Sequence, residues 1–237
     1  MAAQPSVSGQ PSGTNSRQQQ TQAYSESAAS AAAQQQWSEQ FAQVLAGRSD
    51  RILVDAGPVT AEQLAPLPQL AGRLTQLLID AGGVNDETLQ SIAAMDSLEH
   101  LRLRESPISD AGLTALVAAG LPQLRILNIP QARITAAGIA SLAGLPQLVQ
   151  LRLGGAQIDD AAVAVIAQLP QLRSLHLIGP SLTDASLKNL AASPVLSTFY
   201  LDDCPLSDAA WEQLFAAKPK LHVHVDQFHH DRDPNPH

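Results

Sequence analysis

The stretch LPQLRILNIPQARITAAGIASLAG, residues 121–144, is followed directly by LPQLVQLRLGGAQIDDAAVAVIAQ, residues 145–168. The two segments have the same length and nearly the same apolar positions, and both begin with Leu-Pro-Gln-Leu. That tetrapeptide also begins at residues 67 and 169, so it occurs four times in the chain. A repeat of this length indicates a solenoid, in which each unit buries its apolar face only against its neighbours.

The repeat extends far beyond these two segments, because a pattern L-x-x-L-x-L recurs at steps of 24, 26, 24, 24 and 24 residues. It occupies Leu74/Leu77/Ile79, Leu98/Leu101/Leu103, Leu124/Leu127/Ile129, Leu148/Leu151/Leu153, Leu172/Leu175/Leu177 and Leu196/Phe199/Leu201. A degenerate first unit contains residues 52–57, and a last one contains residues 223–225. Each expected strand is followed by a helix-start signal such as Ser109-Asp110, and several of the helices end at a Leu-Pro pair. The pattern therefore predicts about eight units of one strand and one helix.

This pattern resembles the leucine-rich repeat family over about residues 50–226. The units are most similar to ribonuclease-inhibitor-like and F-box-associated repeats, and to bacterial proteins of that style. The resemblance implies an α/β solenoid with a parallel β-sheet on the concave face and helices on the convex face. One position departs from the family, because residues such as Gly82 and Ala156 stand where it usually has Asn or Cys. We expect close packing of these small residues to replace the family's side-chain ladder.

The chain divides into four parts by composition. Residues 1–26 are rich in Gln, Ser and Ala and are expected to form a disordered linker. Residues 27–48 are expected to form a capping helix, with Trp37, Phe41, Val44 and Leu45 on one apolar face. Residues 49–226 are the expected solenoid, and residues 227–237 form a tail rich in His and Asp.

The composition also excludes several classes of protein. A net charge of −8 and only 3% aromatic residues argue against a nucleic-acid-binding surface. The single cysteine, Cys204, allows no intramolecular disulfide or multi-cysteine metal site, and we expect it to be buried. No run of residues is apolar enough to span a membrane. No nucleophile elbow or phosphate-binding loop occurs, so we expect a non-enzymatic protein. We also expect a monomer, cytoplasmic by default and extracytoplasmic if an upstream signal or anchor has been removed.

The expected strands place alternate residues on the concave surface. Reading those positions gives a mildly basic middle, and the candidate residues for binding a protein or peptide are Arg102, Arg104, Arg152, His176 and Tyr200. One interpretation is a docking patch for an acidic partner. The alternative is ordinary solvated surface charge. The leading hypothesis is therefore a protein- or peptide-binding scaffold. A weaker one is a bacterial effector that resembles F-box-type repeat proteins, although the first 48 residues contain no recognisable F-box.

The C-terminal end predicts a different kind of site. His222 and His224 are two residues apart in an expected strand, so both imidazoles project from the same face. The further candidate ligands are Asp202, Asp226, His229 and His230. Imidazole and carboxylate groups suit zinc or another transition metal, which gives a second hypothesis of a metal-binding protein. A metal with an open position could also activate water. The alternative is a polar cap over the last strand.

The strand register decides whether these histidines are exposed. Aligning Leu221 with Leu196 would turn His224 into the core. Aligning Val223 with Phe199 instead buries Val223 and Val225 and leaves His224 on the concave face. Burial of the apolar side chains favours the second register.

Overall fold

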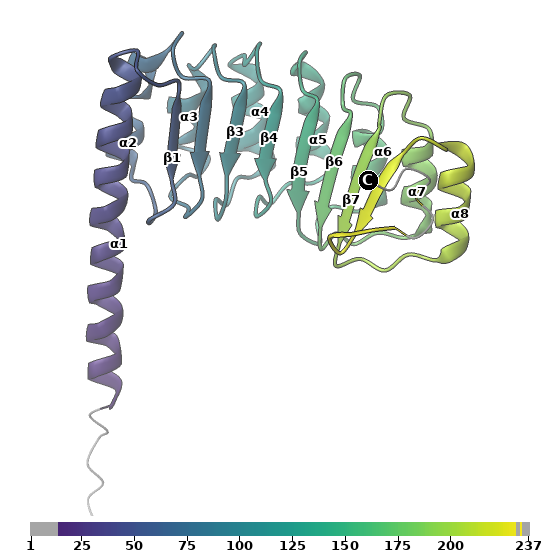
Figure 1. The fold of residues 1–237 in the computed structure, drawn as a ribbon, viewed down its shortest axis with the longest axis horizontal. Coiled ribbons are helices and arrows are strands. Elements are labelled where there is room, and N and C mark those ends of the chain that lie inside the picture. The colour runs from purple at the N-terminus through teal and green to yellow at the C-terminus, as the bar shows by residue number, and fades with distance from the viewer. Residues whose placement is uncertain (1–13, 231–232, 234–237) are drawn as a thin grey trace, which may run out of the picture.

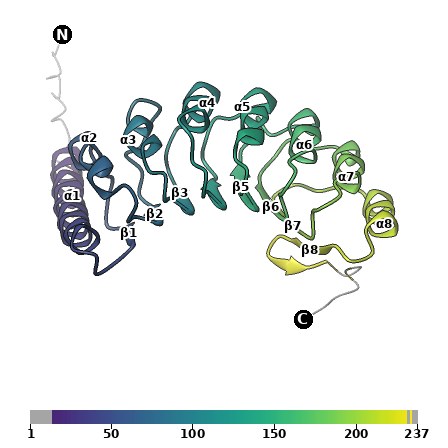
Figure 2. The same cartoon turned by 90° about the horizontal axis from the view of Figure 1, so that it is seen from above.

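The computed structural model describes residues 14–230 and residue 233. The chain forms an α/β solenoid whose nine strands make one sheet in sequence order, β1 to β9. The first eight strands are parallel, and β9 pairs antiparallel with β8. Seen from above, the solenoid is an arc with the strands on its inner side and the repeat helices on its outer side (Figure 2). This is the fold class that the repeat predicts.

The strands are short and regularly spaced along the chain. They are β1 (Arg51–Val54), β2 (Gln76–Ile79), β3 (His100–Leu103), β4 (Ile126–Ile129), β5 (Gln150–Gly154), β6 (Ser174–Ile178), β7 (Thr198–Asp202), β8 (His222–Val225) and β9 (Phe228–His229). The helices are α1 (Thr14–Leu45), α2 (Ala61–Leu64), α3 (Leu89–Ala93), α4 (Asp110–Ala118), α5 (Ala136–Ser141), α6 (Asp160–Ile166), α7 (Asp184–Ala191) and α8 (Asp208–Ala217), with 3₁₀ turns η1 (Leu67–Leu70) and η2 (Leu142–Gly144).

The core runs along the whole arc between the sheet and the helices. At one register position, the inward side chains of successive strands are fully buried, among them Leu127, Leu151, Leu175 and Phe199. Val223 continues this row, pairs with Phe199 and is also fully buried. The register that leaves His224 on the concave face is therefore confirmed.

Adjacent repeats are joined on the convex side by a ladder of Asp and Ser/Thr side chains. The Asp110 carboxylate accepts hydrogen bonds from the backbone N–H (2.8 Å) and the hydroxyl (2.6 Å) of Thr135, which is the N-cap of the next helix. The same pairs recur as Asp86–Ser109, Asp160–Thr183 and Asp184–Ser207. The Ser/Thr residue thus caps its own helix and also binds the preceding repeat, at the first residue of its helix in three pairs and in the turn before α3 in the pair with Asp86.

Two glycines make room for this ladder. A Cβ atom at Gly138 would lie 2.2 Å from Asp110 Oδ1, and one at Gly112 would lie 2.0 Å from Asp86 Oδ1. Small residues also pack closely at two loop positions where the leucine-rich repeat proteins that the sequence resembles usually have Asn or Cys. A Cβ at Gly82 would lie 2.8 Å from the carbonyl oxygen of Glu105, and one at Gly57 would lie 2.6 Å from that of Ala29. Close packing of small residues and the hydrogen bonds of the Asp ladder therefore both connect neighbouring segments of the chain.

The helix α1 covers the first strand and extends beyond the end of the sheet (Figure 1). It begins at Thr14, well before residue 27, the start expected from composition. Glutamine side chains support the earlier start, since Gln22 bonds Glu26 one turn later at 3.0 Å. Trp37 and Val44 are buried as expected, whereas Leu45 is 43% exposed because it ends the helix beside a turn at Gly47. Residues 1–13 of the expected linker lie outside the described part of the chain.

Two glutamines of α1 occupy the open edge of β1. Gln40 accepts a hydrogen bond from the N–H of Leu53 at 2.7 Å and donates to the carbonyl of the same residue at 2.6 Å. One turn earlier, Gln36 accepts from the N–H groups of Asp55 and Ala56, both at 3.2 Å. The side-chain amides thus bind the backbone groups that a neighbouring strand would otherwise pair.

At the other end, the sheet closes with a hairpin. β9 belongs to the segment expected to be a tail, and it folds back along β8 through Asp226 and Gln227. Both turn residues have positive φ angles, 50° and 67°, as in the type I′ turns that connect tight hairpins. Among the described residues, no helix is both long and apolar enough to cross a membrane.

Candidate binding surface and histidine cluster

The strand register builds one continuous row along the middle of the concave sheet. We call it the central row: Arg102, Asn128, Arg152, His176, Tyr200 and His224. Its members come from β3 to β8. Side chains alternate between the two faces of a strand, and the residues on either side of each member are buried, so the members of the row face away from the core. Adjacent members are separated by about 4.8 Å at the backbone. Four of the five predicted binding residues lie in this row, and Arg104 follows β3 at its carboxyl end.

The arginines of this surface differ in their ionic partners. Arg102 donates from Nη2 to Asp80 Oδ2 at 2.6 Å, so its charge is balanced within the protein. In the part of the chain that the structure describes, Arg104 and Arg152 have no carboxylate within ion-pair distance. Burial lowers the pKa of Arg152, and Arg104 lowers it further through charge repulsion. Asp202 partly offsets this repulsion without forming an ion pair, so the positive charge of the surface is concentrated at Arg104 and Arg152.

Several polar atoms of the central row are buried without a hydrogen-bond partner among the described residues. They are Nε of Arg102, Oδ1 of Asn128 and Nε of Arg152, together with Oδ1 of Asp80. Buried polar groups are normally paired, and an unpaired one costs about 1–3 kcal/mol. The middle of the concave face therefore carries unused donors and acceptors.

The second half of the row is aromatic. His176 Nε2 lies 2.8 Å from Asp202 Oδ2, yet burial outweighs this contact and lowers the pKa of His176. The lowered pKa favours the neutral ring of His176, whose Nε2 faces the Asp202 carboxylate. Tyr200 lies between two imidazoles, with ring centres 5.3 Å from His176 and 4.9 Å from His224. These mutually tilted rings form an aromatic shelf beside the arginines.

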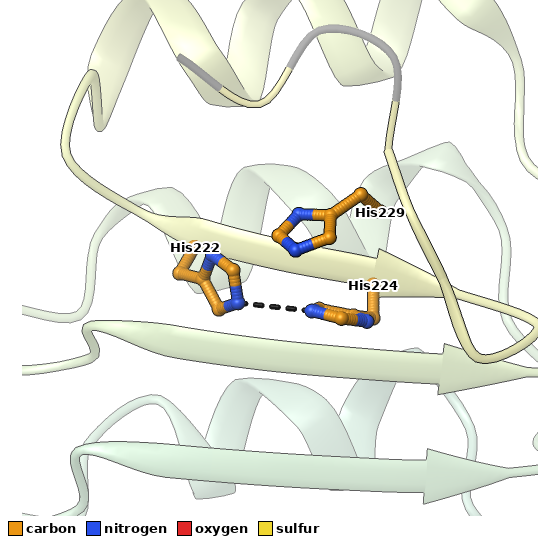
Figure 3. A group of neighbouring side chains, drawn as sticks. All are labelled: His222, His224 and His229. Carbon is orange, nitrogen blue, oxygen red and sulfur yellow. Dashed lines mark hydrogen bonds between the residues drawn. The ribbon is translucent and has the colours of Figure 1, made fainter. Parts of the chain in front are cut away.

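The shelf ends in a cluster of three imidazoles. His222 and His224 project from β8, and the hairpin places His229 of β9 directly opposite His224 (Figure 3). Each of the three offers a ligand atom, and these atoms lie within 4.8 Å of one another. Nε2 of His222 and Nε2 of His224 are 2.9 Å apart. Burial lowers the pKa of His224, and the neighbouring His229 and His222 lower it further.

Three predicted ligands do not join this cluster. Asp202 pairs with His176, and Oδ1 of Asp226 accepts a hydrogen bond from the backbone of Asp203 at 2.8 Å. The ring of His230 packs on the ring of Trp211, with centres 4.7 Å apart. All three line a cavity of about 640 Å³ at the carboxyl ends of the last strands.

The structure adds a tail residue that was not among the candidate ligands. Asp233 has a side chain that is only 1% exposed, and its Oδ2 lies 2.8 Å from Nδ1 of His222 and 3.7 Å from Nδ1 of His229. The same oxygen accepts a hydrogen bond from the backbone N–H of Val223 at 2.9 Å. Asp233 follows the hairpin in a segment that is not part of the repeat, so the repeat pattern could not predict this contact.

No protein-family model matches the chain, and a comparison with curated proteins gives no match either.

Proposed function

We propose that this chain is a non-catalytic leucine-rich repeat protein that binds a protein or peptide across its concave sheet. The proposal rests on one observation above all, the unpaired polar atoms of Arg102, Asn128 and Arg152 in the middle of that sheet. These atoms are inaccessible to solvent, so a partner laid across the central row would supply the missing hydrogen bonds once the side chains turn toward it. Because each buried unpaired group is unfavourable, pairing several of them favours binding.

The charge distribution indicates what the partner carries at this point. Arg104 and Arg152 repel each other, and neither forms an ion pair with a carboxylate among the described residues, although Asp202 partly offsets the repulsion at Arg152. A carboxylate of the partner would relieve that repulsion and form charge-assisted hydrogen bonds with the planar guanidinium groups. Tyr200 and His176 would pack against the adjoining part of the partner, since aromatic side chains are favourable at interfaces. We therefore infer a peptide segment with acidic side chains.

Fluorescence polarisation tests this proposal. Short labelled peptides with Glu at alternate positions are compared with otherwise identical peptides carrying Gln. We expect the protein to bind the Glu series more tightly, and an Arg104→Gln/Arg152→Gln variant to lose at least about tenfold in affinity, since a charged hydrogen bond contributes about 1.5–3 kcal/mol.

The matched control is Arg125→Gln/Arg173→Gln, which removes the same charge from exposed positions before β4 and β6. This control should bind like the original protein. Equal loss of binding in both double variants would show a nonspecific effect of net charge and contradict the proposal. Failure to distinguish Glu peptides from Gln peptides would contradict it as well.

A further inference from the structure

We propose that His222, His224 and His229 bind one divalent transition-metal ion, most favourably Zn²⁺, at the C-terminal end of the concave sheet. This proposal does not depend on peptide binding, although His224 is also the last member of the central row. Its three imidazoles come from the two strands of one hairpin, so a bound ion would join β8 to β9 (Figure 3).

The hairpin brings the three rings together. His222 and His224 are alternate residues of β8 and lie on the same face, whereas His229 is the cross-strand partner of His224. The ring centres are 4.7 Å apart for His222 and His224, 4.8 Å for His222 and His229, and 4.2 Å for His224 and His229. The tight turn that produces this arrangement uses Asp226 and Gln227 at positive φ, where glycine and asparagine are preferred.

The two rings of β8 are oriented as metal ligands are. The Asp233 carboxylate faces Nδ1 of His222, and the backbone of Gln227 accepts a hydrogen bond from the ring of His224. Each ring thus has an acceptor on one side and directs its Nε2 atom toward the other ring. Metal-bound histidines almost always have a carboxylate or carbonyl acceptor on the second nitrogen, because it fixes the tautomer and the ring orientation.

The distances suit a tetrahedral ion after a small adjustment. With bonds of 2.0–2.1 Å, two nitrogens of a tetrahedral zinc site are about 3.3 Å apart. Nε2 of His222 and Nε2 of His224 are 2.9 Å apart, so they must separate by a few tenths of an ångström. His229 lies at the surface, with a side chain that is 36% exposed, and has room to turn toward the same point.

The ligand set selects the class of metal. Three neutral imidazoles are borderline ligands that favour zinc, cobalt, nickel or copper over the hard cations calcium and magnesium, which prefer oxygen. Three protein ligands leave a fourth position for water, since the Asp233 carboxylate is engaged behind His222. Because the site joins β8 and β9, we expect the metal to stabilise the hairpin that ends the sheet.

Metal binding is measured on untagged protein stripped with a chelator. Zinc is titrated in competition with a chromogenic chelator, and cobalt(II) is added separately because tetrahedral cobalt absorbs strongly in the visible range. We expect one zinc per chain, a tetrahedral cobalt spectrum and no competition by calcium. His224→Ala should abolish binding. Asp233→Asn, which removes the charge behind His222 and beside Nδ1 of His229, should weaken binding about 10- to 100-fold.

The matched control is His100→Ala, which removes a half-buried concave histidine of β3 far along the sheet from the cluster. It should bind zinc like the original protein. Hydrogen exchange at residues 222–229 should slow when zinc is added to the original protein and to His100→Ala, and not to His224→Ala. Absence of stoichiometric zinc in the folded original protein would overturn the proposal. Undiminished binding by a folded His224→Ala variant would overturn it too.

Discussion

Replacing Gln40 by Met tests whether α1 closes the sheet through side-chain amides. Met has nearly the same length and a similar helix propensity, so the substitution removes the amide and little else. It leaves the N–H and the carbonyl of Leu53 without the hydrogen bonds at 2.7 and 2.6 Å that Gln40 provides.

The expected loss follows from these two bonds. Each hydrogen bond contributes about 1 kcal/mol net, so the free energy of unfolding should fall by about 2 kcal/mol. For a chain of this size, that corresponds to a decrease of about 4–8 °C in the melting temperature. The loss should be local, since repeat proteins are stabilised by contacts between neighbouring units. Amide hydrogen exchange at Leu53 should therefore become faster, while exchange in β6 stays the same.

The matched control is Gln35→Met in the same helix. Gln35 is exposed and bonds only Glu39, one turn later, at 2.8 Å. This substitution should lower the stability by at most about 0.5 kcal/mol. Urea denaturation followed by circular dichroism compares the two variants. If Gln40→Met and Gln35→Met have the same unfolding midpoint and the same exchange at Leu53, the amides do not hold the edge and the reasoning is refuted.

Three further predictions concern the solenoid itself. Asp110→Ala should destabilise the protein by about 1–3 kcal/mol, because it removes both bonds to Thr135. In a double-mutant cycle it should also reduce the free-energy cost of Gly138→Ala, because both changes act on one contact. Additive costs would contradict this prediction. Phe199→Ala should lower the free energy of unfolding by about 3–5 kcal/mol, measured by urea denaturation, because the ring is fully buried; a loss below about 1 kcal/mol would not fit. Since the pKa of His176 is lowered in the folded state, its contribution to stability is complete above its unfolded value of about 6.5 and is lost as the pH falls through the folded value. Urea midpoints should therefore decline less from pH 7 to 5 in His176→Gln than in the original protein.

The repeated part of the fold could be predicted because the same pattern of apolar and helix-start residues recurs from unit to unit. The Leu positions define the strands and their register, and the Ser/Thr-Asp pairs mark the helix starts. Two Asp residues of the ladder, Asp110 and Asp184, belong to these same pairs. Their second role stayed hidden because Asp110 looks like an ordinary first-turn residue, and its bond to Thr135 depends on how closely the next repeat packs.

The two ends of the chain could be predicted only in part, because no repeat describes them. The apolar face of α1 was visible in Trp37 and Val44, whereas the amide contacts of Gln36 and Gln40 depend on where the helix docks. At the other end, His222 and His224 follow from strand alternation. The position of Asp233 depends on a turn and an aperiodic segment that no periodic pattern encodes.

The different closures of the two sheet ends also bear on self-assembly. A solenoid of similar units has a first face and a last face that are complementary by construction, so open copies could stack head to tail into a fibre. Here the backbone of β1 is occupied by Gln36 and Gln40, and β8 is already paired with a strand of opposite direction. Parallel addition of another copy would have to displace α1 from one molecule and the β9 hairpin from the other. The repeated units could stack into an array of any length, and two non-repeating segments, α1 and the β9 hairpin, end that array.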